Sequence, residues 1–195
     1  VHQHFMLVPS LTVTENIIMG MEPVKGIRVD LAYARQQVEE MGKKFNLYVD
    51  PDKRVEDLTV GQKQRVEILK ALFRGAKILI LDEPTAVLTP QETQELFDEL
   101  LHLKENGYTI IFISHKLQEI KQICDRITII RRGVTMGVHE VASATEKDIS
   151  RLMVGRDVIL NTEKSPCKPG EALVKIRNLV ILDENGKRAV DGISF

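Results

Sequence analysis

Apolar residues recur at spacings of three and four along several segments, which is the pattern of amphipathic helices. The clearest segment covers 31–45, where Asp30 stands before the first apolar position and makes a favourable N-cap. Gly75 and Gly107 follow two further segments and are typical helix stops. The pattern predicts helices over 14–19, 31–45, 61–75, 90–106 and 117–123.

Three short segments are instead continuously apolar: 78–82 (ILILD), 109–114 (TIIFIS) and 127–130. Such runs are expected of strands that are buried on both faces of a parallel sheet. Because these strands alternate with helices, the order predicts an α/β fold with a parallel sheet core. The region before Gly75 holds no strong strand pattern and is predicted to be a helical insert.

The last third of the chain changes character. Residues 161–171 are polar and contain two prolines and a glycine, which predicts a linker. Beyond them two apolar runs flank Asn185-Gly186, a strong hairpin signal. The chain opens with Val1 rather than Met and stops in a strand-like run, so we expect a piece of a longer protein. The expected divisions are 1–160 (5–75 mainly helical, 76–140 sheet core), 161–171 and 172–195.

Composition excludes several classes of protein. The 195 residues carry a formal net charge of -1, which provides no overall basic field for nucleic acid. Hydrophobic residues make up 43% of the chain, too many for a disordered protein. Cys124 and Cys167 form neither a disulfide framework nor a zinc motif. No apolar run reaches the ~18 residues of a membrane span.

Two adjacent acids end the first apolar strand, in the stretch ILILDEPT. In open α/β sheets ligands bind beyond the carboxyl ends of the strands. Asp82 there is suited to Mg²⁺, and Glu83 to polarising a water for attack on a phosphate. The alternative is a strand followed by an acidic helix cap.

Three more places carry candidate chemistry. In LTVGQ, Thr59 and Gly61 stand at a predicted helix start, which suits an anion or simply caps the helix. His115 follows the second apolar strand, where it contacts a phosphate or caps the next helix. Gln3 offers a carbonyl to a metal or water. His2 and His4 beside it lack a nearby third ligand for a metal site of their own.

Gln3, LTVGQ, ILILDEP and the Ser-His pair at 114–115, in this order, resemble the ATP-binding subunit of ABC transporters. The resemblance implies an ABC-type P-loop NTPase fold, lacking the Walker A part. It implies that Gln3 is the Q-loop residue touching Mg²⁺, Asp82 the metal-site acid, Glu83 the catalytic base and His115 the switch histidine. The residues expected to bind the γ-phosphate of an ATP held by the opposite half are Leu58, Thr59, Val60, Gly61 and Gln62.

Three segments resemble the sequence of the first half of fused, two-module ATPases that serve simple-sugar and nucleoside importers. They are VHQHFMLVPSLTVTENI, LDEPTAVLTPQE and LMVGRD. The resemblance makes 1–160 a first module and 172–195 the opening strands of a second. It implies membrane-spanning permease subunits as partners, an extracellular solute-binding protein acting indirectly, and a peripheral place on the cytoplasmic face of the membrane. Nucleic acid is not among the expected partners.

The chain departs from the family pattern at three points. The usual signature LSGGQ reads LTVGQ, and Val60 does not easily take a positive φ. Thr89 stands where most D-loops have Asp. No GxxxxGK[ST] phosphate loop is present, so this chain alone is expected to be inactive.

Two alternatives to an import ATPase remain open. One is a soluble tandem ABC ATPase acting on ribosomes or DNA, which usually carries a long, highly charged linker, unlike 142–171 here. The other is a binding-only module whose ATPase has decayed. The presence of Glu83 and His115 argues against a decayed ATPase, whereas Val60 and Thr89 weakly favour one.

Overall fold

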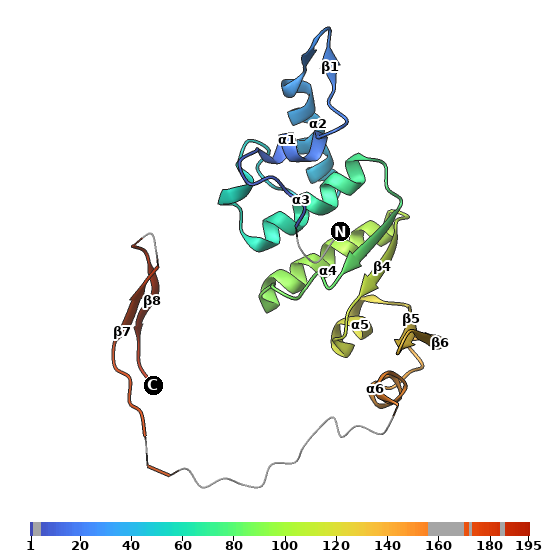
Figure 1. Ribbon diagram of the computed structural model, residues 1–195, viewed down its shortest axis with the longest axis vertical. Coiled ribbons are helices and arrows are strands. Elements are labelled where there is room, and N and C mark those ends of the chain that lie inside the picture. The colour runs from blue at the N-terminus through green and yellow to red at the C-terminus, as the bar shows by residue number, and fades with distance from the viewer. Residues whose placement is uncertain (2–4, 156–169, 172, 184–185) are drawn as a thin grey trace. The chain divides into compact units, whose positions relative to one another are not determined.

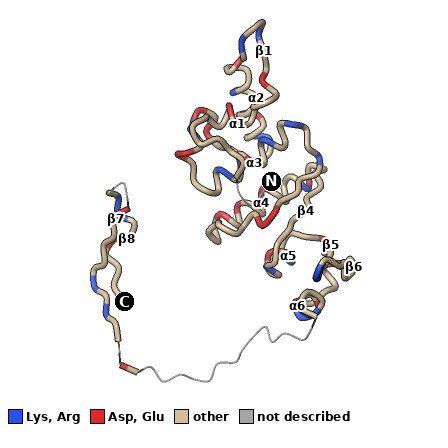
Figure 2. The backbone as a smooth tube through the Cα atoms, in the orientation of Figure 1, with Lys and Arg blue, Asp and Glu red and all other residues tan. Residues whose placement is uncertain are grey.

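The computed structural model describes residues 1, 5–155, 170–171, 173–183 and 186–195. The chain divides into two compact units, Val1–Val158 and Ile159–Phe195, and each is described by itself. Figure 1 shows the first unit as a helical part followed along the chain by a sheet part. Basic and acidic residues are interspersed over both parts (Figure 2), in keeping with the nearly balanced charge.

The helical part contains α1 (Val13–Ile18), α2 (Leu31–Lys44), a 3₁₀ turn (Val55–Asp57) and α3 (Val60–Phe73). Its strands are the two-residue pair β1 (Val24–Lys25) and β2 (Arg28–Val29), so this segment is mainly helical, as the sequence pattern predicts. Thr12, Asp30 and Thr59 cap the three α-helices through side-chain oxygens that accept backbone N–H bonds. The helices pack on one another around fully buried aliphatic side chains: Val13, Ile17, Val38, Leu47, Ile68 and Leu69.

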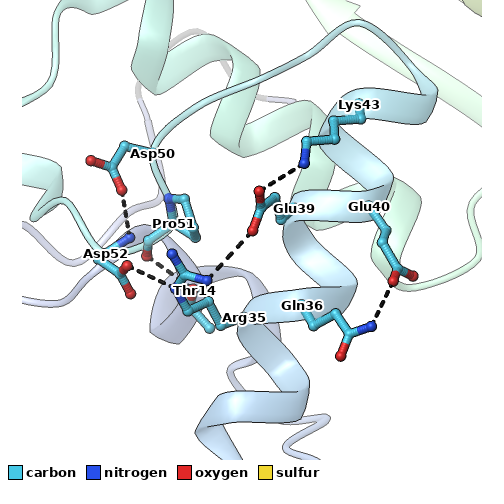
Figure 3. Close-up of polar contacts among 9 residues, drawn as sticks. All are labelled: Thr14, Arg35, Gln36, Glu39, Glu40, Lys43, Asp50, Pro51 and Asp52. Atoms are coloured by element: carbon cyan, nitrogen blue, oxygen red, sulfur yellow. Dashed lines mark hydrogen bonds and ion pairs between the residues drawn. The ribbon is translucent and has the colours of Figure 1, made fainter.

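Polar contacts tie α2 to the turn that follows it (Figure 3). Arg35 Nε donates to Asp52 Oδ2 at 2.7 Å, which joins the helix to the turn, whereas Lys43 Nζ donates to Glu39 Oε1 at 2.8 Å within α2 itself. These pairs are exposed, and such pairs stabilise a fold by about 0–1 kcal/mol each. The buried bond from Thr14 Oγ1 to Pro51 O, 2.9 Å, fixes the same turn against α1.

The sheet part is built on β3 (Ile78–Asp82) and β4 (Thr109–Ile113), which pair in parallel from Ile78 opposite Thr109 to Asp82 opposite Ile113. Helix α4 (Pro90–Glu105) connects them and begins at a capping box of Thr89 and Glu92. Leu79 and Leu81 of β3 and Phe97 and Leu100 of α4 are buried in the same core. Val1 lies along β3, donating to Ile80 O at 2.8 Å and accepting from Asp82 N at 3.2 Å.

The prediction that both strands are buried on both faces is wrong for this structure. Ile78 and Ile80 are 59% and 51% exposed, and Ile111 and Ile113 are each 46% exposed. Side chains along a strand point alternately to the two faces of the sheet. Since α4 packs against one face only, the isoleucines on the other face stay exposed. Within the described residues, the other face carries these isoleucines uncovered.

The third predicted parallel strand is also wrong in its pairing. β5 (Arg126–Arg131) pairs antiparallel with β6 (Val134–Glu140), a strand that the sequence pattern did not reveal. Arg132 and Gly133 join them with φ of 50° and 77°, the backbone of a two-residue hairpin turn. Helix α5 (Leu117–Ile123) has its predicted bounds, whereas α6 (Glu146–Val154) was not predicted. A second small core joins these elements: Ile120, Ile127, Ile129, Val141 and Ile149.

The second unit contains β7 (Leu179–Leu182) and β8 (Arg188–Ile193), which pair antiparallel as the hairpin signal predicts. Gly186 has a φ of 77°. Asn185, Cys167 and most of the predicted linker lie outside the described residues.

One buried ion pair joins α3 to α4. Arg65 Nε donates to Glu99 Oε1 at 2.6 Å, and its NH2 group donates to Glu95 Oε2 at 2.6 Å. Glu99 is 4% exposed. Burial raises the pKa of Glu99 from 4.5 to about 7, although the Arg65 guanidinium opposes the shift. The folded chain therefore binds a proton at Glu99 in a pH range where the unfolded chain does not.

This pair makes fold stability depend on pH. Since the pKa of Glu99 is higher in the folded state, the free energy of unfolding should rise as pH falls from 7.5 to 5. A shift of this size corresponds to about 3 kcal/mol at most. Glu99→Gln keeps a carbonyl for Arg65 and cannot titrate. Urea unfolding across this pH range should show wild type gaining stability relative to the variant; a constant difference would contradict the protonation.

Candidate functional site

The carboxyl ends of β3 and β4 lie side by side because the two strands are parallel and in register. Asp82 is the last residue of β3, opposite Ile113 at the end of β4. Glu83 and His115 follow within two residues of these ends. The pairing of the strands therefore brings Asp82 and Glu83 close to His115, which lies 32 residues after Glu83 in the sequence.

Glu83 stands in a left-handed backbone conformation, with φ of 44°. Few residues other than glycine adopt this region, and those that do gather at functional sites. Its backbone N–H donates to Ile113 O at 3.0 Å, which continues the strand pairing by one residue. The turn thus begins at the residue predicted to be the base.

The Glu83 carboxylate and the His115 imidazole are in contact. His115 Nδ1 lies 2.9 Å from Glu83 Oε1, a distance at which the Nδ1–H donates and the carboxylate accepts. The side chains are 68% and 33% exposed, respectively. A carboxylate held in this way is oriented and open to solvent, which suits it to accept a proton from a water molecule.

Asp82 offers the site an exposed carboxylate directly beside Glu83. Mg²⁺ prefers oxygen ligands and commonly takes one or two carboxylates, with water and substrate phosphate oxygens filling the rest of its shell. A single aspartate at a strand end fits that requirement. No cluster of three or more His, Cys, Asp or Glu residues able to hold a metal occurs among the described residues. Gln3, His2 and His4 lie outside them.

The LTVGQ residues lie elsewhere, at the start of α3. Thr59 and Gln62 form a capping box: Gln62 N donates to Thr59 Oγ1 at 3.3 Å, and Thr59 N donates to Gln62 Oε1 at 3.1 Å. Val60 is the first residue of α3, so it needs no positive φ. Leu58 is buried just before the cap. The helix cap is thus real; Thr59 and Val60 at its start are exposed, whereas Gly61 and Gln62 are partly buried.

Gly61 has a neighbour that the sequence did not suggest. A Cβ atom at this position would lie 3.0 Å from Glu92 Oε1, so the glycine admits the first turn of α4 close to the first turn of α3. The two helices border a cavity of about 240 Å³, with Thr59 and Gln62 at one side and three glutamates from α4 at the other. Those glutamates are Glu92, Glu95 and Glu99.

Sequence reasoning missed a buried carboxylate behind the site. Glu119 of α5 is 9% exposed and accepts hydrogen bonds from Thr85 and Ser114, which flank the predicted catalytic residues in the sequence. A pattern of apolar spacing does not reveal such a residue. The only sequence signal is its place four residues after His115.

No helix in the described ranges has the length and apolar content needed to span a bilayer.

Three comparisons bear on the family. The model of the family described as "ABC transporter" matches residues 1–86. All 195 residues are 49% identical to the nucleoside import ATP-binding protein NupA of Lactococcus lactis and 45% identical to the guanosine import ATP-binding protein NupO of Bacillus subtilis. The chain spans 38% of the length of each of these relatives.

A solved structure supports the fold. The protein cbiO1 of Clostridium perfringens, part of the ABC transporter complex cbiONQ, superposes with a TM-score of 0.58 at 28% identity. The match covers 70% of this chain and 53% of that one. The predicted fold class, a P-loop NTPase of ABC type with a parallel sheet core and a helical part, is therefore confirmed. The chain belongs to the family of ABC transporter ATPases.

Proposed function

We propose that this chain provides catalytic residues to an ATPase subunit that energises the import of a small solute, a nucleoside or a simple sugar. The observation that carries the proposal is the contact between Glu83 and His115, 2.9 Å, at the carboxyl edge of the parallel sheet. A carboxylate beside a histidine at this edge suits hydrolysis of a phosphoanhydride.

Each residue has a distinct part in the proposed reaction. Glu83 accepts the proton of the attacking water through its carboxylate. His115 holds that carboxylate through its Nδ1–H, and in the doubly protonated form its Nε2–H would donate to the γ-phosphate. Asp82 would hold Mg²⁺ together with Gln3, which lies outside the described residues. Bound Mg²⁺ would neutralise part of the phosphate charge.

The N-terminus of α3 gives the proposal a second part. Helix N-termini bind anions through backbone N–H groups and the positive end of the helix dipole. In this structure the Gln62 N–H donates to Thr59 Oγ1 and the Gly61 N–H to the Glu92 carboxylate, so a phosphate would have to replace these acceptors. Leu58, Thr59, Val60, Gly61 and Gln62 would then bind the γ-phosphate of an ATP held by a second module. We place the first module at 1–160 and the opening of the second module of the same chain at 172–195.

The relatives support a choice of solute and partners. Two proteins that share nearly half of the residues are named for nucleoside and guanosine import. We accordingly favour a nucleoside over a sugar, with membrane-spanning permease subunits as direct partners and an extracellular solute-binding protein as an indirect one. The chain would lie peripherally at the cytoplasmic face of the membrane. These names favour transport over a soluble tandem ATPase acting on ribosomes or DNA.

In the full-length protein, Glu83→Gln should leave ATP binding intact and slow steady-state hydrolysis by ~10²–10⁴. The amide keeps the shape of the side chain and still accepts the His115 bond, but it cannot take a proton. The measurement is ATPase turnover together with nucleotide affinity, and nucleoside uptake in cells carrying the variant should fall with turnover. Glu105→Gln, on an exposed position of α4, is the matched control. Hydrolysis within a factor of two of wild type would refute Glu83 as the base.

His115→Ala should also slow turnover, because the Glu83 carboxylate loses its orienting bond and the phosphate loses a donor. Nucleotide affinity should be spared, since His115 is 68% exposed and no part of the main phosphate grip is expected at this position. Single-turnover hydrolysis and thermal unfolding, measured on the same preparation, separate chemistry from folding. The N-cap of α5 is Lys116, so His115 does not cap that helix. Unchanged turnover per folded molecule with lowered stability would give His115 a structural role only.

A further inference from the structure

Glu119 is a buried carboxylate that no step of the proposed reaction uses. It lies in the first turn of α5 and is 9% exposed. Thr85 Oγ1 donates to its Oε2 at 2.8 Å, and Ser114 Oγ donates to the same oxygen at 3.1 Å. Its other oxygen, Oε1, pairs with Lys116 Nζ at 2.9 Å. All three donors therefore converge on one side chain.

These donors come from the two loops that carry the proposed catalytic residues. Thr85 follows Glu83 by two positions, whereas Ser114 and Lys116 stand directly before and after His115. Lys116 also reaches across to the first loop, where its Nζ donates to Thr85 O at 3.3 Å. Glu119 thus joins two segments that are about thirty residues apart in the sequence.

The bonds to Glu119 compensate the cost of burying its carboxylate between the two loops. A glutamate in the first turn of a helix is favourable on the surface, through the helix dipole alone. Burying a carboxylate is costly unless charged or hydroxyl donors compensate it. Here Thr85 is 2% exposed, so its bond to Glu119 is shielded from water, and shielding strengthens it.

We propose that Glu119 is a positioning residue: it holds the Glu83 loop and the His115 loop at one separation, so that the 2.9 Å contact between those side chains persists. The proposal rests on the proposed ATPase function. Groups that orient reacting residues commonly change activity by ~10–100-fold when removed, and a displacement of about 1 Å is enough for such a loss.

Variants of Glu119 in the full-length protein should lower kcat by different amounts, according to the number of bonds that each removes. Glu119→Ala removes every bond and should lower kcat ~10–100-fold, with KM for ATP changed less than about twofold. Glu119→Gln can place its carbonyl oxygen where Oε2 lies, which keeps both hydroxyl bonds and loses only the Lys116 pair. Its loss of kcat should therefore be clearly smaller. Thr85→Val removes one hydroxyl bond and serves if Glu119→Ala does not fold.

A second readout does not depend on hydrolysis. Amide hydrogen exchange of the full-length protein should speed up in peptides covering 83–88 and 113–118 in Glu119→Ala and stay at the wild-type rate in the surface control Glu105→Gln. Faster exchange in both loops, together with the graded loss of kcat, supports the proposal.

Exchange unchanged in either loop would overturn it, as would faster exchange with kcat kept. Equal losses of kcat in Glu119→Gln and Glu119→Ala would also overturn the role of the two hydroxyl bonds. Should Glu83→Gln retain hydrolysis, the proposed function fails by itself, and the exchange rates still decide whether Glu119 fastens the loops.

Discussion

The parallel, in-register pairing of β3 with β4 is the constraint on which the candidate site depends. Five residue pairs align the strands so that both end at the same edge. The bond from Glu83 N to Ile113 O extends the alignment one residue beyond the strands. His115, two residues after the end of β4, therefore lies close enough for its Nδ1 to contact the Glu83 carboxylate at 2.9 Å. A slip of one residue in this register would turn the strand side chains to opposite faces and separate the pair.

Exposed and buried polar groups have different roles at the carboxyl edge of the sheet. The pair that would meet substrate, Glu83 and His115, is open to solvent. The groups behind it, Thr85 and Glu119, are buried and bonded to each other. Exposed side chains are readily reoriented, so an exposed reacting pair needs a rigid support close by. The buried bonds of Glu119 give such a support to both loops.

Much of the fold was predictable from local signals. Capping residues and periodic apolar positions located α1 to α5 to within two residues, as at Asp30 and α2, whereas α6 was missed. The strands β3 and β4 were equally clear, but a continuous apolar run does not show whether both faces find cover. The hairpin of β5 and β6 was not predicted from the sequence, because Arg132-Gly133 is a weaker turn signal than Asn-Gly and β6 contains a glycine.

The site was predictable where the chain order alone sets it. Strand ends bring Asp82, Glu83 and His115 to one edge in any parallel arrangement of these two strands. The close approach of Glu92 to Gly61 and the bonds of Glu119 depend on tertiary packing between distant segments. No spacing rule along one helix or strand encodes such contacts.

In the proposed reaction Glu83 and His115 act as one unit. A double-mutant cycle of Glu83→Gln and His115→Ala in the full-length protein tests it through ATPase kcat. Residues that act as a unit are strongly non-additive, so the double variant should be within about twofold of the slower single variant. Losses that multiply would show two independent residues and contradict the account.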